Sequence, residues 1–80
     1  MIAVRVRLYA TLRQYQPQLK IGEPFITRLP KGATVKQLIA DLGIPEDTVK
    51  LVFSGGRAVE EEHELEDGED LGMFPPVAGG

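Results

Sequence analysis

The sequence predicts an α+β domain in which a mixed sheet of about five strands carries one main helix on one face. Residues 2–9 and 25–29 alternate apolar and polar side chains, which is the period of a half-buried strand. Residues 34–42 instead place apolar side chains three and four positions apart, as on one face of a helix. Further strand patterns follow, and no second helical stripe is present, so one helix has to cover the sheet.

The first strand presents its apolar side to the core and its charged side to solvent. The apolar side holds Ile2, Val4, Val6 and Leu8. Arg5 and Arg7 lie on the other side, where their charges can complement the acidic residues at 60–70. Residues 11–24 are polar and broken by Pro and Gly, which predicts a loop that can hold one short turn. Residues 25–29 then form a second strand, antiparallel to the first.

The helix is predicted over residues 34–42. Thr34 is a suitable N-cap, and Gln37 three positions later completes a capping box. Gly43 can end the helix in a left-handed conformation, and Pro45 prevents its continuation. The residues expected to be buried on its apolar face are Val35, Leu38, Ile39 and Leu42.

Residues 48–59 predict a strand, a tight turn at Gly55-Gly56 and a short strand. A phosphate-binding loop is a weak alternative for these glycines, because no Lys-Ser/Thr and no helix follow them. Residues 70–74 predict the last strand, which the two prolines at 75 and 76 end. The first and last strands both need buried neighbours, and a central parallel pair satisfies both. This arrangement is the β-grasp, or ubiquitin-like, fold, with the domain at residues 1–74 and a flexible tail at 75–80.

Composition narrows the classes of function. The 80 residues are enough for one domain, and the formal net charge is −3. Residues 1–40 carry seven of the nine Lys and Arg residues, whereas eight of the twelve acidic residues fall at 60–70. This balance argues against nucleic acid as a partner. We interpret the acidic run as a solvated loop, with a docking patch for a basic partner as the alternative.

The sequence contains no Cys, which excludes disulfides and a cysteine nucleophile. The apolar start is interrupted by arginines, and no run approaches the length of a membrane helix, so we expect a cytoplasmic protein without membrane contact.

No residue inside the domain is predicted to be catalytic or to bind a metal. His63 lies among acidic residues and is interpreted as a solvated loop residue. Ser54 has neither a nucleophile elbow nor a nearby histidine in the sequence. Three consecutive glutamates at 60–62 do not by themselves converge on one ion. The aromatic residues are interpreted as core and sheet packing rather than as a base-stacking surface; they are Tyr9, Tyr15, Phe25, Phe53 and Phe74.

The tail is the remaining candidate. Gly79 and Gly80 lack Cβ atoms, so they can adopt extended or left-handed conformations and pass through a narrow channel. Pro75 and Pro76 favour a stiff, extended exit from the domain. A terminal carboxylate is inert until it is activated, for instance as an acyl-adenylate, and a side chain on the last residue would hinder the activating enzyme. Terminal fraying is the alternative interpretation.

The ending DGEDLGMFPPVAGG resembles the small, MoaD-like subunit of molybdopterin synthase, within the MoaD/ThiS family of ubiquitin-like sulfur carriers. The resemblance extends over the whole chain, from VRVRLYATLRQ through TVKQLIADLG, and is most specific in FPPVAGG at 74–80. Thiazole-forming carriers also end in Gly-Gly, but usually without Phe-Pro-Pro.

The resemblance implies a sulfur-carrier mechanism. An E1-like adenylating enzyme would use ATP to activate Gly80, which would then become a thiocarboxylate. The tail would insert into the large catalytic subunit of molybdopterin synthase and donate its sulfur. Gly79 would be the flexible neighbour of the reactive residue, and the partner-binding segment that threads into the subunit would comprise Phe74, Pro75, Pro76, Val77 and Ala78. The chain would thus be a protein co-substrate, with no bound cofactor or metal and no enzymatic activity of its own.

Other functions remain open at this point. The sulfur acceptor can instead be a tungsten-enzyme cofactor, a thiazole or tRNA. The same carboxylate can also serve a protein modifier that is conjugated to lysines. A ubiquitin-like adaptor that binds a partner only through its sheet is the third class, and it gives the two glycines no role.

Overall fold

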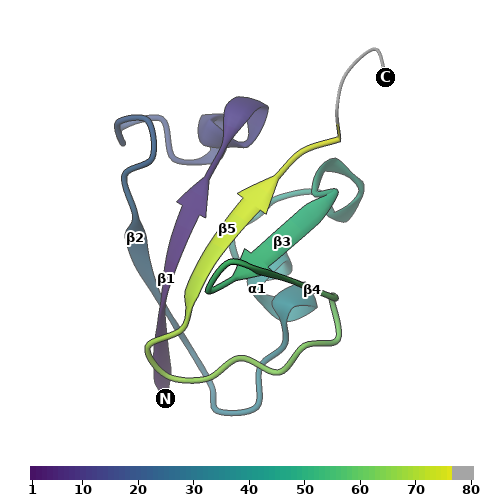
Figure 1. Ribbon diagram of the computed structural model, residues 1–80. Coiled ribbons are helices and arrows are strands. Elements are labelled where there is room, and N and C mark those ends of the chain that lie inside the picture. The colour runs from purple at the N-terminus through teal and green to yellow at the C-terminus, as the bar shows by residue number, and fades with distance from the viewer. Residues whose placement is uncertain (77–80) are drawn as a thin grey trace.

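The computed structural model describes residues 1–76, which form a five-stranded mixed sheet with one α-helix packed on one face (Figure 1). The strands are β1 (Ile2–Leu8), β2 (Phe25–Leu29), β3 (Leu51–Ser54), β4 (Arg57–Val59) and β5 (Asp70–Phe74). The helix is α1 (Val35–Asp41), and two short 3-10 helices are η1 (Ala10–Tyr15) and η2 (Glu46–Thr48). The spatial order is β2-β1-β5-β3-β4. The predicted β-grasp fold is therefore confirmed.

The first and last strands form the predicted parallel pair inside the sheet. Val6 lies opposite Leu71 and Leu8 opposite Met73. The two strands therefore run in the same direction, and their C-terminal ends lie side by side, as Figure 1 shows. Strand β2 pairs antiparallel with β1, as predicted, and β3 pairs antiparallel with both β5 and β4. Gly55 and Gly56 turn the β3–β4 hairpin with positive φ angles of 57° and 86°. This is the glycine-dependent turn that the sequence predicted.

Helix α1 begins and ends with the predicted caps. The Thr34 amide donates to Gln37 Oε1 at 2.9 Å, and the Gln37 amide donates to Thr34 Oγ1 at 3.3 Å, which completes the capping box. Gly43 ends the helix with a φ of 73°. The amide of Ile44 then donates to the carbonyl of Ile39 at 3.2 Å, and both side chains are buried in the core. These contacts are those of a Schellman motif.

The core lies between α1 and one face of the sheet. It consists of Ile2, Val4, Val6, Leu8, Leu12, Leu29, Ala33, Val35, Leu38, Ile39, Ile44, Val52, Leu65, Leu71 and Met73. The prediction that Leu42 is buried was wrong, because this residue is the C-cap of α1 and only partly packs against the core. Ile44, which follows the left-handed Gly43, is the buried residue at that end of the helix.

Two segments differ most from the sequence prediction. The segment predicted as a loop with a short turn contains the six-residue helix η1, which places Leu12 in the core at 1% exposure. The strand predicted from residue 48 begins at Leu51, because Thr48 belongs to η2. The Thr48 hydroxyl donates to the carbonyl of Pro45 at 2.6 Å, and this hydrogen bond stabilises a turn rather than a strand.

The acidic segment 60–70 is more ordered than the predicted solvated loop. Leu65 is only 3% exposed, and its amide donates to the carbonyl of Ala33 at 2.8 Å. The amide of Lys36 donates to the carbonyl of Glu61 at 2.9 Å, which fixes the segment along the start of α1. The segment is therefore a strap across the domain, with its acidic side chains mostly exposed.

Candidate functional site

Strand β5 fixes the point at which the chain leaves the sheet. It is paired on both sides, and its inward side chains Leu71 and Met73 are almost completely buried. Backbone bonds continue to its end: the Lys50 amide donates to the carbonyl of Phe74 at 2.8 Å, and the Tyr9 amide donates to that of Met73 at 3.1 Å. The end of β5 is therefore held by backbone bonds from the residues that follow β1 and precede β3.

Of the predicted tail, the structure describes only the first part. Phe74 ends β5 and is half-buried, Pro75 is half-buried, and Pro76 is exposed. The predicted residues Val77, Ala78, Gly79 and Gly80 lie outside the described residues. The roles assigned to these four residues, and the division of the chain at residue 75, stay predictions.

Three aromatic side chains gather around this exit on the face of the sheet opposite α1. The rings of Tyr9 and Phe74 are stacked, with centroids 4.5 Å apart and an interplanar angle of 5°. Phe53 meets Phe74 edge-on, at 5.6 Å and 88°. Both geometries are favourable for aromatic pairs. The prediction of sheet packing is correct for these three residues, and Tyr15 and Phe25 pack against the core on the other side.

Gly72 creates space beside this aromatic cluster. A Cβ atom at this position would lie 3.3 Å from Tyr9 Cε2 and 3.7 Å from Phe74 Cε1. The first distance is tighter than ordinary van der Waals contact, so the glycine lets the Tyr9 ring lie close over the strand. A shallow hollow of about 360 Å³ is lined by Gly72 together with Phe53, Phe74 and Arg7. Its aromatic part is bordered by the charged side chains of Arg7 and Asp70.

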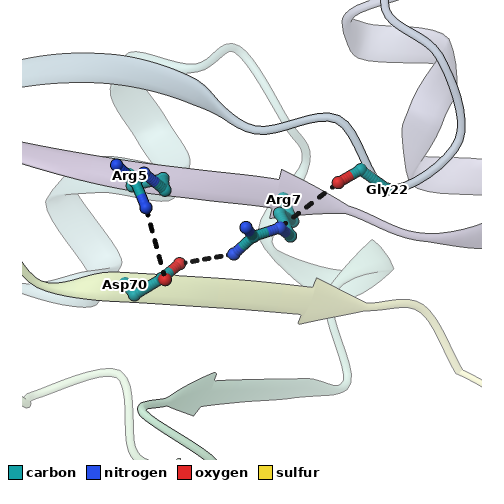
Figure 2. Close-up of polar contacts among 4 residues, drawn as sticks. All are labelled: Arg5, Arg7, Gly22 and Asp70. Atoms are coloured by element: carbon teal, nitrogen blue, oxygen red, sulfur yellow. Dashed lines mark hydrogen bonds and ion pairs between the residues drawn. The ribbon is translucent and has the colours of Figure 1, made fainter.

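The charged border of this face comes from three strand residues (Figure 2). Arg7 Nη1 lies 2.7 Å from Asp70 Oδ1, and Arg5 Nη1 lies 3.9 Å from Asp70 Oδ2. Arg7 Nε also donates to the carbonyl of Gly22 at 3.2 Å, which ties the loop before β2 to the sheet. The predicted solvent-facing register is confirmed, because the Arg5 and Arg7 side chains are 53% and 31% exposed. Exposed ion pairs of this kind contribute about 0–1 kcal/mol.

The prediction of His63 as a solvated loop residue holds only in part: the residue lies in a loop, but its side chain is half-buried and paired. Its Nε2 lies 2.6 Å from Glu69 Oε2, and the Ser54 hydroxyl donates to the same carboxylate oxygen. Glu69 Oε1 in turn accepts from the Glu66 amide at 2.8 Å. Ser54 comes from β3, whereas His63 and Glu69 lie six residues apart in the strap. The local sequence carried no signal of this contact, and Ser54 does have a histidine close by through Glu69.

This cluster fixes the strap to β3 and is unsuited to hydrolysis. In a serine hydrolase, the histidine lies between serine and acid, whereas here the carboxylate of Glu69 lies between Ser54 and His63. Burial raises the pKa of Glu69. The hydrogen bonds from Ser54, the Glu66 amide and His63, together with the positive charge of protonated His63, outweigh burial and hold that pKa below its ordinary value.

Among residues 1–76, no three His, Asp or Glu side chains come together as ligands for a metal ion. No helix in the described part of the chain is long and apolar enough to cross a membrane.

A β-grasp sheet whose central strand leads through Phe74 to the end of the domain defines a ubiquitin-like protein. The sequence profile of the Mut7-C ubiquitin family matches residues 1–78, and the chain belongs to this family. No curated protein matches the chain significantly.

Solved structures support the same class. A protein described as subunit 1 of a molybdopterin converting factor from Pyrococcus furiosus is 29% identical, with a TM-score of 0.74 over 96% of this chain and 100% of that one. Small archaeal modifier protein 1 of Haloferax volcanii is 20% identical, with a TM-score of 0.74 and the same coverage. The complex of subunits 1 and 2 of the molybdopterin-converting factor from Helicobacter pylori contains a chain that is 21% identical, with a TM-score of 0.62 over 99% of this chain and 100% of that one.

These neighbours place the chain in the ubiquitin-like fold that sulfur carriers and protein modifiers share, and the predicted resemblance to MoaD-like proteins is confirmed. At 20% and 21% identity, the second and third comparisons bear on the fold alone.

Proposed function

We propose that the chain is a sulfur carrier whose Gly80 carboxylate is adenylated and converted to a thiocarboxylate, which then donates sulfur in the biosynthesis of molybdopterin. It would act as a protein co-substrate, with catalysis by its partners. The observation that carries this proposal is the placement of β5: a central, doubly paired strand leads directly through Phe74, Pro75 and Pro76 to the Gly-Gly sequence.

This placement suits a carrier because it fixes the position at which the tail begins. The end of β5 is held by backbone bonds on both sides, so a partner that docks on the sheet meets the tail at a defined position. Two consecutive prolines favour an extended path away from the domain. Glycines at 79 and 80 leave no side chain to obstruct an enzyme around the reactive carbonyl.

The face of the sheet opposite α1, which carries Tyr9, Phe53 and Phe74 and is called the aromatic face below, would be the docking surface for the two proposed partners. These partners are an E1-like adenylating enzyme and a large synthase subunit. Tyr9, Phe53 and Phe74 supply partly exposed aromatic area, and aromatic residues are enriched in the centres of interfaces. Arg7 and Asp70 supply a polar border that can set orientation. The Helicobacter pylori neighbour shows that a chain of this fold occurs in a complex of two subunits, which is compatible with a protein partner.

The proposed chemistry takes place on the Gly80 carboxylate. A carboxylate oxygen attacks the α-phosphorus of ATP, which forms the acyl-adenylate and releases pyrophosphate. A sulfur donor attacks the carbonyl carbon, and AMP leaves. When the donor is a persulfide, cleavage of its S–S bond by a thiol leaves the sulfur on the carbonyl as a thiocarboxylate. The chain supplies the carboxylate, and ATP and sulfur come from the activating system.

Exchange of labelled pyrophosphate into ATP, catalysed by the E1-like partner in the presence of the chain, tests the first step. The chain is expected to stimulate exchange, whereas a variant with one alanine added after Gly80 is expected to give none. Gly80→Ala keeps a carboxylate but adds a methyl group, so its exchange should be slower. Equal exchange with the extended variant would overturn the proposal.

A protein modifier is the second candidate, because the fold is shared with small archaeal modifier protein 1. It requires the same activation, but ends in an amide bond to a lysine of another protein. Activated chain incubated with a cell extract would then form higher-mass conjugates that resist reducing agents. Sulfur transfer to thiazole or tRNA, and a pure adaptor role, are the remaining alternatives, and the adaptor role predicts no pyrophosphate exchange at all.

A further inference from the structure

A second surface lies on the opposite side of the β3–β4 hairpin from the aromatic face. A groove of about 490 Å³ runs between α1, η2 and the hairpin. Adjacent residues of a strand point to opposite faces, so the buried Val52 lines this groove whereas Phe53 lies with the aromatic cluster. The two surfaces are therefore separated by the sheet itself.

The floor of the groove is apolar and partly open. Ile39 of α1 belongs to the core, and Val49 and Val59 are only half-buried where they pack against it. Leu51, at the border, is 46% exposed. Strand β4 is at the edge of the sheet, with β3 as its single strand neighbour among the described residues, so this side of the hairpin remains accessible.

The rim of the groove is acidic. Four glutamates lie around the floor, with Lys50 as the one basic residue of the lining; they are Glu46, Glu60, Glu61 and Glu62. The last three are presented by a segment whose backbone is fixed: the Lys36 amide donates to the carbonyl of Glu61 at 2.9 Å, and the His63 amide donates to that of Glu60 at 3.0 Å. The backbone that presents these three glutamates is thus ordered before any partner binds, which lowers the entropic cost of binding.

Glu46 and Glu61 both line the groove. A shared hydrogen bond with Glu46 and the negative charge of Glu46 raise the pKa of Glu61, while the charge of Lys36 lowers it. A positive group placed between Glu46 and Glu61 would relieve this repulsion.

We propose that this groove is a docking site for a basic segment of a partner protein, in which one aliphatic side chain covers Val49 and Val59 and flanking Lys or Arg residues pair with Glu46 and Glu61. The charge of the rim decides the class of partner. Four glutamates repel nucleic acid phosphates and anionic lipids and attract a basic peptide. The apolar floor also requires an aliphatic side chain, which a simple polycation lacks. Because the groove and the aromatic face lie on opposite sides of the sheet, both can be occupied together.

The test is an NMR titration of the ¹⁵N-labelled full chain with the acetylated, amidated peptide Arg-Lys-Leu-Lys-Arg. The largest amide shifts are expected at Val59, Glu61 and the neighbouring residues of the groove. Glu61→Lys should weaken binding at least about fivefold, whereas Glu66→Lys, an equal charge change at an exposed acid outside the groove, should have a smaller effect. Val59→Thr, which keeps the size of the side chain but replaces one methyl group by a hydroxyl, should also weaken binding.

Three control ligands and conditions sharpen this experiment. The peptide Arg-Lys-Gly-Lys-Arg lacks the aliphatic side chain and is expected to bind more weakly, and spermidine more weakly still. High salt should weaken the binding of both peptides, which carry the same charges, but should leave the difference between the Leu and Gly peptides in place. Equal binding of both peptides, equal effects of Glu61→Lys and Glu66→Lys, or shifts confined to the aromatic face would overturn the proposal. The experiment needs no activating enzyme, so its outcome is independent of the chemistry proposed for Gly80.

Discussion

Replacing Tyr9 and Phe74 by leucine, singly and together, is expected to reveal a coupling of about 1 kcal/mol in the free energy of unfolding. The two rings are stacked at 4.5 Å and 5°, and aromatic pairs contribute about 0.5–1.5 kcal/mol beyond the area that they bury. Both side chains are half-buried rather than fully buried, which places the expected value inside this range rather than at its upper end. Leucine keeps most of the apolar area, so the cycle isolates the contact between the rings.

The single variants are expected to differ. Phe74→Leu also removes the edge-on contact with Phe53 at 5.6 Å, so it should destabilise the domain more than Tyr9→Leu does. Urea unfolding monitored by circular dichroism gives each free energy, and an unchanged dependence on urea would show that the unfolded state is comparable. Tyr15→Leu combined with Phe74→Leu is the matched control, because Tyr15 packs against the core and not in this cluster. Single effects of Tyr9 and Phe74 that add to within about 0.3 kcal/mol would refute the argument.

Three further predictions concern the core, the helix cap and the strap. Leu38→Ala should destabilise the domain by about 2–5 kcal/mol, because Leu38 is completely buried. Leu42→Ala should destabilise it less, because Leu42 is only partly buried. Equal effects of the two substitutions in chemical denaturation would contradict the packing described. Thr34→Ala removes the cap of α1 and should cost about 1 kcal/mol, measured as a shift in the unfolding midpoint. Because the pKa of Glu69 is lower in the folded chain, its contribution to stability is complete above its ordinary pKa of 4.5 and is lost as the pH falls through the folded value. The stability difference between the natural chain and Glu69→Gln should therefore shrink when unfolding is measured at low pH, and a constant difference would contradict the role of this carboxylate.

The elements that the sequence predicted well are those with a local signal. The strand at residues 2–8 has a clear period of two, and the start of α1 is specified by Thr34 and Gln37, which are only three residues apart. The Gly55-Gly56 turn is likewise specified by its own residues. Five strands and one helix in this order leave few arrangements, and this is why the central parallel pair could be predicted as well.

The features that were missed depend on contacts between distant segments. Leu12 and Leu65 are single apolar residues in polar surroundings, so no periodicity indicates that they are buried. The contact of His63 with Glu69 and Ser54 joins the strap to β3, and neither the pair nor the lowered pKa of Glu69 has a signature in the local sequence.

The candidate site likewise combines a part that the local sequence predicts with a part that depends on contacts between distant residues. The Phe-Pro-Pro exit was visible in the sequence, because it is a continuous motif. The hollow beside it depends on the register that places Phe53 opposite Gly72, and on the stacking of Tyr9 against Phe74. Such registers are set by the whole sheet, so only the structure brings these residues together.

The central claim is that the Gly80 carboxylate carries sulfur. The most direct measurement is the intact mass of the chain after incubation with the proposed E1-like enzyme, ATP and a sulfur donor, followed by fragmentation to locate the change. The account predicts a gain equal to the mass difference between sulfur and oxygen, located at Gly80, and no gain in a variant with one residue added after Gly80. An unchanged mass with an active cognate enzyme, or an equal gain in the extended variant, would contradict it.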